Sequence, residues 1–151
     1  MRKACRLIYA TAALTFMLCL TGLVMSGEAQ AQRFVDNGNG TVTDTVTNLM
    51  WTKDAHPFGR LNWHDAMSRC SSFSVSGIGG WRLPSRDELV ALYHAMSGGH
   101  PFTGVQTSTY WTSTTFSTDA PYAWFVSLYN GHMKSCDKTS NYYVWPVRAG
   151  Q

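Results

Sequence analysis

Histidine, the side chain most often used for acid–base catalysis and metal binding, is scattered along this chain. No two histidines are separated by one or three residues, so the sequence contains neither a His-x-His nor a His-x-x-x-His zinc pair. A zinc site assembled from distant segments is the alternative. We predict no metal site, and we expect His94 to be a packed or surface residue of a helix. The five histidines are His56, His64, His94, His100 and His132.

Other catalytic signatures are also missing from the sequence. There is no Gly-x-Ser-x-Gly nucleophile elbow. The glycine-rich stretch Ser76–Gly80 lacks the lysine and the spacing of a phosphate-binding loop. Asp36–Gly40 places glycines where a calcium loop needs side-chain oxygens, so it predicts a turn instead. We therefore predict no catalytic residues, no cofactor and no enzymatic activity.

Two stretches carry side chains suited to binding a sugar. The segment 98–119 is rich in Thr and Ser, and the segment around Asn130-Gly131 has an aromatic and basic face. Aromatic rings stack on sugar faces, hydroxyls hydrogen-bond to sugars, and lysine and histidine can meet an acidic group. The alternative is that this face packs against the first predicted helix. The predicted ligand-binding residues are Thr107, Thr109, Tyr129, His132 and Lys134.

Two helices are predicted among the elements that must position these side chains. The first begins near Asn62, a good N-cap residue. The second begins with a capping box formed by Ser85 and Glu88, and Gly98-Gly99 ends it. Between the helices lies Trp81-Arg82-Leu83, where alternation predicts that both apolar side chains are buried and that Arg82 is held by hydrogen bonds.

Short strands are predicted in the rest of the chain. They are expected on both sides of the turn at 36–40, at 110–114, on both sides of Asn130-Gly131, and at 142–148, where Pro146 indicates an edge or a bulge. Helices embedded among short strands predict an α+β fold. For the hairpin we predict a two-residue type I′ turn at Asn130-Gly131, with Tyr129 opposite His132 and Phe125 opposite Cys136.

The N-terminal segment has the pattern of a secretory signal peptide. A short basic stretch precedes an apolar run, Leu7–Met25, and Ala29-Gln30-Ala31 supplies the small residues of a cleavage site. We predict a signal peptide over residues 1–31, one mature domain over 32–151, and a periplasmic or secreted location. An uncleaved membrane anchor is the alternative.

Export changes the interpretation of the cysteines. Cys5 and Cys19 would leave with the signal peptide, and Cys70 and Cys136 would remain as an even pair in an oxidising compartment. A disulfide between Cys70 and Cys136 is the expected arrangement. Two separate thiols are the alternative, because pairing cannot be read from sequence.

Charge gives no support for a nucleic-acid partner. The whole chain carries a formal net charge of +3 from twelve Lys and Arg and nine Asp and Glu. Three of these cations and one of these acids lie in residues 1–31, which leaves +1 on residues 32–151. That is too little for the basic surface that nucleic-acid binding requires. The membrane is expected to be a partner only through the signal segment before cleavage.

A series of ordered motifs runs through the chain: Gly40–Asp44, Asn48–Trp51, Gly80–Pro84, Glu88-Leu89, Tyr110–Thr114, Ala123–Val126 and Val144–Arg148. With these motifs the chain resembles the Lcl C-terminal domain family, which is named for a collagen-like bacterial adhesin and catalogued as a domain of unknown function. The resemblance covers Arg33 to Gln151. It implies a C-type lectin-like fold and an exported bacterial domain used for ligand binding, often in adhesion.

Three differences from family relatives and from other proteins of the implied fold reduce the number of functions that fit this chain. Relatives often carry a cysteine in the last strand, where this chain has Trp145. The Glu-Pro-Asn and Trp-Asn-Asp tripeptides of calcium-dependent lectins are absent. The formylglycine-generating enzymes, which share the implied fold, need a pair of cysteines near the C-terminus, and Cys136 is the one candidate. We therefore expect a non-enzymatic, adhesin-like domain that binds a glycan or a protein. A structural envelope protein is the alternative, and an oxidase of the formylglycine-generating type is the weaker one.

Overall fold

A four-stranded antiparallel sheet joins the two ends of the domain. The computed structural model describes residues 32–116 and 121–150, so the predicted signal peptide lies outside the described residues. The strands are β1 (Phe34–Asp36), β2 (Thr41–Asp44), β3 (Leu49–Thr52) and β9 (Val147–Ala149), in the order β1-β2-β3-β9. The predicted turn between β1 and β2 is confirmed, because Asn37 N–H donates to the Thr41 carbonyl and Gly38 and Gly40 have positive φ.

A second sheet has five strands. They are β4 (Arg60–Leu61), β5 (Thr109–Thr115), β6 (Tyr122–Ser127), β7 (Met133–Asp137) and β8 (Tyr142–Tyr143), in the order β4-β8-β5-β6-β7. The pair β5–β8 is parallel and the other pairs are antiparallel. The predicted strand at 142–148 is therefore divided into β8 and β9, one in each sheet. Pro146 lies between them, where its missing N–H breaks no ladder.

The helices α1 (Trp63–Ser72) and α2 (Arg86–Ala95) begin at the residues predicted to cap them. The Asn62 side chain accepts a hydrogen bond from the Asp65 N–H, and Ser85 and Glu88 form the complete capping box. A short 3₁₀ helix, η1 (Met96–Gly98), follows α2. Together with the two sheets, these helices confirm the α+β class.

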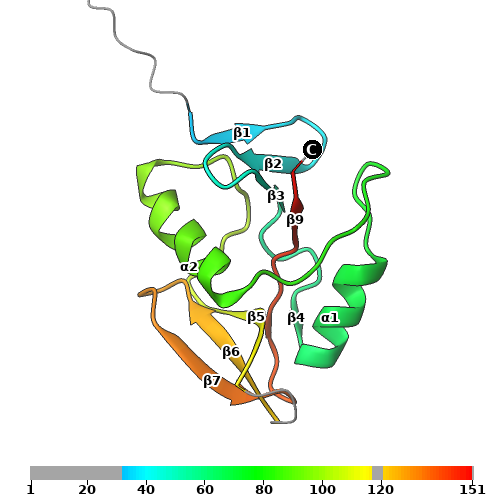
Figure 1. Ribbon diagram of the computed structural model, residues 1–151, viewed down its shortest axis with the longest axis vertical. Helices are drawn as coiled ribbons and strands as arrows, with labels where there is room; N and C mark the ends of the chain where they lie inside the picture. The colour runs from blue at the N-terminus through cyan, green and yellow to red at the C-terminus, as the bar shows by residue number, and fades with distance from the viewer. Residues whose placement is uncertain (1–31, 117–120, 151) are drawn as a thin grey trace, which may run out of the picture. The chain divides into compact units, whose positions relative to one another are not determined.

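The two helices cover opposite faces of the five-stranded sheet. Successive strand residues point to opposite faces, so Tyr110 and Trp111 of β5 enter different clusters. Trp111 packs with Cys70 of α1, and Tyr110 belongs to the cluster of Leu92 of α2. Figure 1 shows the two helices on either side of the C-terminal segment that carries β9. The face on the α1 side also carries the candidate functional site.

Aromatic side chains make up much of the core, and four tryptophans are fully buried in it. Trp145 stacks edge-on against Trp51 and donates its indole N–H to the Thr52 carbonyl. Trp111 donates its indole N–H to the Leu61 carbonyl, which ties β5 to β4. The fully buried tryptophans are Trp51, Trp81, Trp111 and Trp145.

The prediction for the segment before α2 is confirmed. Trp81 and Leu83 are buried, and the Arg82 guanidinium donates to both carboxylate oxygens of Glu88 at 2.8 Å. The same Glu88 carboxylate also accepts the Ser85 N–H of the capping box. Glu88 therefore joins the start of α2 to the segment that precedes it.

Replacing Glu88 with glutamine is expected to lower the free energy of unfolding by about 1 kcal/mol at neutral pH, because the ion pair with Arg82 is lost. The loss is small since Arg82 is exposed and solvent screens the pair. The hydrogen bond from Arg82 holds the pKa of Glu88 below its usual range. A lowered pKa stabilises the fold above the pKa of the unfolded chain, and this contribution disappears as the pH falls through the folded value. Urea unfolding of both proteins at pH 7 and pH 3 should show a difference that shrinks in acid. A difference that grows in acid would contradict this.

The hairpin between β6 and β7 differs from its predicted register and turn. The structure pairs Phe125 with Lys134, not with Cys136, so the register is shifted by two residues. Ser127 and His132 close a four-residue loop, Leu128–Gly131, in place of a two-residue type I′ turn. Gly131 has a φ of 72°, whereas Asn130 is not in the left-handed region. The loop is longer because Leu128 is held outside the ladder: its N–H donates to the Ser108 carbonyl beside β5, and the Leu128 side chain is buried.

The predicted disulfide between Cys70 and Cys136 is wrong, since both cysteines are free. Cys70 is buried in the cluster between α1 and the sheet, and burial raises the pKa of its thiol to about 12. The Cys136 sulfur instead lies 3.3 Å from the Ser140 hydroxyl. This hydrogen bond, aided by one with Tyr142, lowers the pKa of the Cys136 thiol. The two thiols have different environments within one cluster, and sequence spacing cannot show this.

Candidate functional site

Helix α1 covers only part of the sheet face that it packs against. The covered part carries Trp111 and Ala123, which are buried in the cluster with Ala66 of α1. Thr109 and Ser127, directly opposite each other on β5 and β6, lie on the same face nearer the hairpin loop and are only half-buried. The face is therefore closed beside α1 and open at the β6–β7 hairpin.

The open part of this face forms a pocket of about 220 Å³. Phe125 is half-buried, and its ring is held in place because it packs against the buried cluster between α1 and the sheet. Lys134 is opposite Phe125 in the strand register, and the His132 carbonyl accepts the Ser127 N–H. The pocket is lined by Thr109, Phe125, Ser127, Asn130, His132 and Lys134.

The polar side chains of this pocket are available to a ligand. Within residues 32–116 and 121–150, neither the hydroxyls of Thr109 and Ser127 nor the charged end of Lys134 has a hydrogen-bond or ion-pair partner. The side-chain oxygen of Asn130, Oδ1, accepts a hydrogen bond from the His132 backbone N–H at 3.1 Å, which fixes the end of the hairpin loop. The pocket thus combines one aromatic wall with hydroxyl, imidazole and ammonium groups.

The structure brings three of the five predicted binding residues together. Thr109, His132 and Lys134 line one pocket, as the shared-face interpretation requires. Tyr129 is 76% exposed on the hairpin loop and Thr107 is exposed before β5, and neither lines the pocket. The two alternatives drawn from the sequence each describe part of this face, because α1 covers one end of it and leaves the other open.

Three residues that line the pocket are not among the predicted ligand-binding residues: Phe125, Ser127 and Asn130. Strand alternation places Phe125 and Ser127 on one face of the hairpin, although neither is among the predicted ligand-binding residues. Asn130 was assigned to the turn alone, and the four-residue loop places it beside His132. The alternation pattern was the available signal for Ser127, and no sequence signal gave the loop length that recruits Asn130.

No group of three or more His, Cys, Asp or Glu side chains close enough to hold a metal ion occurs within residues 32–116 and 121–150. Over these residues, no helix has the length and apolar character needed to cross a bilayer.

A family model described as the Lcl C-terminal domain matches residues 40–148 of the chain. The match begins in the β1–β2 turn, ends in β9, and includes every residue that lines the pocket. No curated protein matches the chain.

Proposed function

The chain belongs to the Lcl C-terminal domain family, and on that premise we propose that it is a non-catalytic, adhesin-like domain whose ligand is a glycan. The observation that carries the proposal is the pocket at the β6–β7 hairpin, where the Phe125 ring is joined by hydroxyl and basic groups that have no partner among the described residues. The C-type lectin-like fold that the family resemblance implies is part of the same proposal.

The chemistry of a sugar fits this combination of side chains. A sugar presents apolar C–H patches, which pack on an aromatic ring, and a rim of hydroxyls, which both donate and accept hydrogen bonds. Phe125 supplies the ring, and Thr109 and Ser127 supply hydroxyls. Lys134 and His132 add donors that would hold an acidic substituent. The pocket is small and lies at the surface, so it suits one residue of a longer glycan more than an enclosed metabolite.

Replacing Lys134 with alanine is expected to weaken glycan binding about tenfold, because a charge-assisted hydrogen bond is lost. Tyr129→Ala is the matched control, since Tyr129 lies on the same hairpin but outside the pocket. A glycan array would identify the ligand, and calorimetry at two salt concentrations would measure its affinity. Binding to an acidic glycan should weaken with salt, and this dependence should be smaller in Lys134→Ala.

Both variants alter exposed side chains, so thermal unfolding should be unchanged and should separate binding defects from folding defects. Equal affinities for Lys134→Ala and the unaltered protein would contradict the proposed pocket. A protein that binds no glycan on the array would instead favour a structural role in the cell envelope.

We also propose that the domain acts outside the cytoplasm, in the periplasm or after secretion. The support is the sequence pattern of residues 1–31, with its basic start, apolar run and small-residue cleavage site. N-terminal sequencing of the exported protein is expected to begin at Gln32. A protein that keeps Met1 and stays with the membrane fraction would show that the segment is an anchor.

A further inference from the structure

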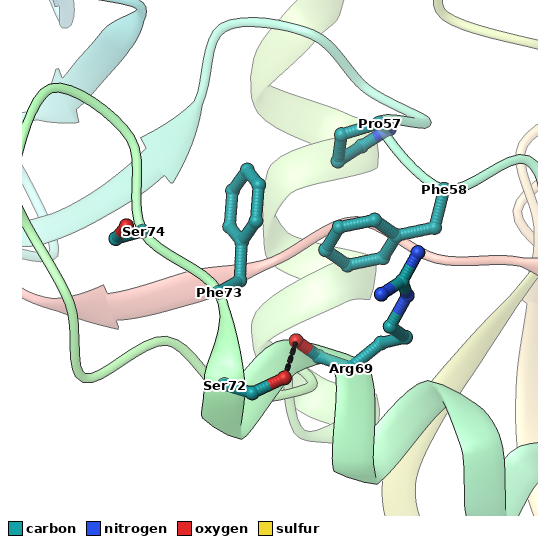
Figure 2. Close-up of a pocket in the computed structure, with 6 residues that line it drawn as sticks. All are labelled: Pro57, Phe58, Arg69, Ser72, Phe73 and Ser74. Atoms are coloured by element: carbon teal, nitrogen blue, oxygen red, sulfur yellow. Dashed lines mark hydrogen bonds between the residues drawn. The ribbon is translucent and has the colours of Figure 1, made fainter.

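A second pocket lies at the C-terminal end of α1 and shares no residue with the hairpin pocket. Its volume is about 290 Å³. Figure 2 shows the rings of Pro57, Phe58 and Phe73 around one space, with the Arg69 side chain beside Phe58. The pocket is lined by Pro57, Phe58, Arg69, Ser72, Phe73 and Ser74.

The apolar rings of this pocket are held in place by their neighbours. Phe58 and Phe73 meet edge to face, with their centroids 4.8 Å apart. Phe73 caps α1 by donating its N–H to the Cys70 carbonyl, and its ring lies against buried Trp81. The Gly59 N–H closes the turn that carries Phe58. A ligand would therefore meet walls that need little rearrangement.

Arg69 lacks the carboxylate partner that three other arginines of the described residues have. Arg33, Arg82 and Arg86 each form an ion pair with a carboxylate. The Arg69 guanidinium instead lies 5.8 Å from the centre of the Phe58 ring. Over residues 32–116 and 121–150 it has no carboxylate partner and donates no hydrogen bond. Its five N–H donors are thus free for an incoming acceptor.

The remaining polar groups limit the charge of that acceptor. The Ser72 hydroxyl is bonded to the Ser68 and Arg69 carbonyls, and the second of these bonds is drawn in Figure 2. The C-terminal end of a helix carries partial negative charge, which opposes negative charge on the ligand and opposes two such charges more strongly than one. One guanidinium beside a helix C-terminus therefore matches a single carboxylate better than a phosphate dianion.

We propose that this pocket binds an apolar carboxylate, that is, one carboxylate joined to an aromatic or aliphatic body. The Arg69 guanidinium would bind the carboxylate through paired hydrogen bonds, and the rings of Pro57, Phe58 and Phe73 would enclose the body. The same chemistry occurs in a free small acid and in the C-terminus of a peptide that ends in an aromatic residue.

The test uses 3-phenylpropionate and its neutral amide, 3-phenylpropanamide, in calorimetric titrations of the mature protein. We expect the acid to bind about tenfold more tightly than the amide. Arg69→Gln should abolish this preference. Arg60→Gln is the matched control, because Arg60 is also exposed, stacks on an aromatic ring and lacks a carboxylate partner within residues 32–116 and 121–150, yet lies outside the pocket. It should keep the preference.

A second pair of titrations separates the two sources of the ligand. An acetylated tripeptide ending in phenylalanine is compared with its amidated form. Tighter binding of the free-carboxylate peptide than of 3-phenylpropionate supports a peptide terminus, and the reverse supports a free acid. Equal affinities for acid and amide, no binding of either at millimolar concentration, or an unaltered preference in a folded Arg69→Gln protein would overturn the proposal.

Discussion

Replacing Trp111 with alanine is expected to lower the free energy of unfolding by about 3–5 kcal/mol. Trp111 is fully buried between α1 and the sheet, and its ring stacks on Tyr142 with centroids 4.7 Å apart. Its indole N–H donates to the Leu61 carbonyl at 2.9 Å. Alanine would leave a cavity in this cluster and remove the bond that ties β4 to β5. A loss of this size is a large share of the stability of a small domain.

Urea unfolding of Trp111→Ala and Trp111→Phe would measure this loss and divide it between packing and hydrogen bonding. Phenylalanine keeps most of the apolar contact but cannot donate to the Leu61 carbonyl, so its cost should be clearly smaller. Tyr122→Ala is a control, because Tyr122 is an exposed aromatic residue on the neighbouring strand β6. If Trp111→Ala unfolded at the same urea concentration as Tyr122→Ala, Trp111 would not be central to the core.

Replacing Gly131 with valine is expected to lower the free energy of unfolding by about 2–4 kcal/mol. Two separate effects contribute. Gly131 has a φ of 72°, which a β-branched residue resists. A Cβ atom at this position would also lie 2.6 Å from the Tyr93 ring of α2, so the ring would have to move. The hairpin loop and α2 are therefore in close contact, and a larger side chain would push them apart.

Gly131→Ala and Gly98→Ala separate the two effects from the general cost of losing a glycine. A Cβ at Gly98 meets no atom within 4 Å, and its φ is not in the left-handed region, so Gly98→Ala should be nearly neutral. Gly131→Ala should fall between Gly98→Ala and Gly131→Val in thermal unfolding. A Gly131→Val protein as stable as Gly98→Ala would show that the loop adopts another conformation in solution.

The helices could be predicted because their signals are local. The Ser85 and Glu88 box depends on hydrogen bonds within one turn of chain, and the same is true of the Asn62 cap. The turn at Asn130-Gly131 could not be predicted as well, because contacts far away in the sequence decide it. Leu128 is buried and bonded to Ser108, and these contacts lengthen the loop that Asn-Gly alone would close with two residues.

The site was partly predictable for a related reason. A register shift of two residues leaves every side chain on its original face, so His132 and Lys134 stay on the predicted surface. Tyr129 moves from a strand position into the loop and leaves the site for that reason. The cysteines show the opposite limit, because their count suggests a bond that only three-dimensional positions can establish. The Arg69 pocket has no sequence signal, since it joins two loops and a helix end.

The division of the C-terminal segment between two sheets sets the order in which the domain can assemble during synthesis. β8 joins β4 to β5 in one sheet, and β9 closes the other sheet against β3. Met50 of β3 is paired in the strand register with Arg148 of β9, which lies close to the C-terminal end of the domain sequence. A ribosome-bound chain that lacks its last strands therefore leaves an open edge in both sheets. Contacts of such long sequence separation slow folding, and the four-stranded sheet is complete only after β9 has emerged.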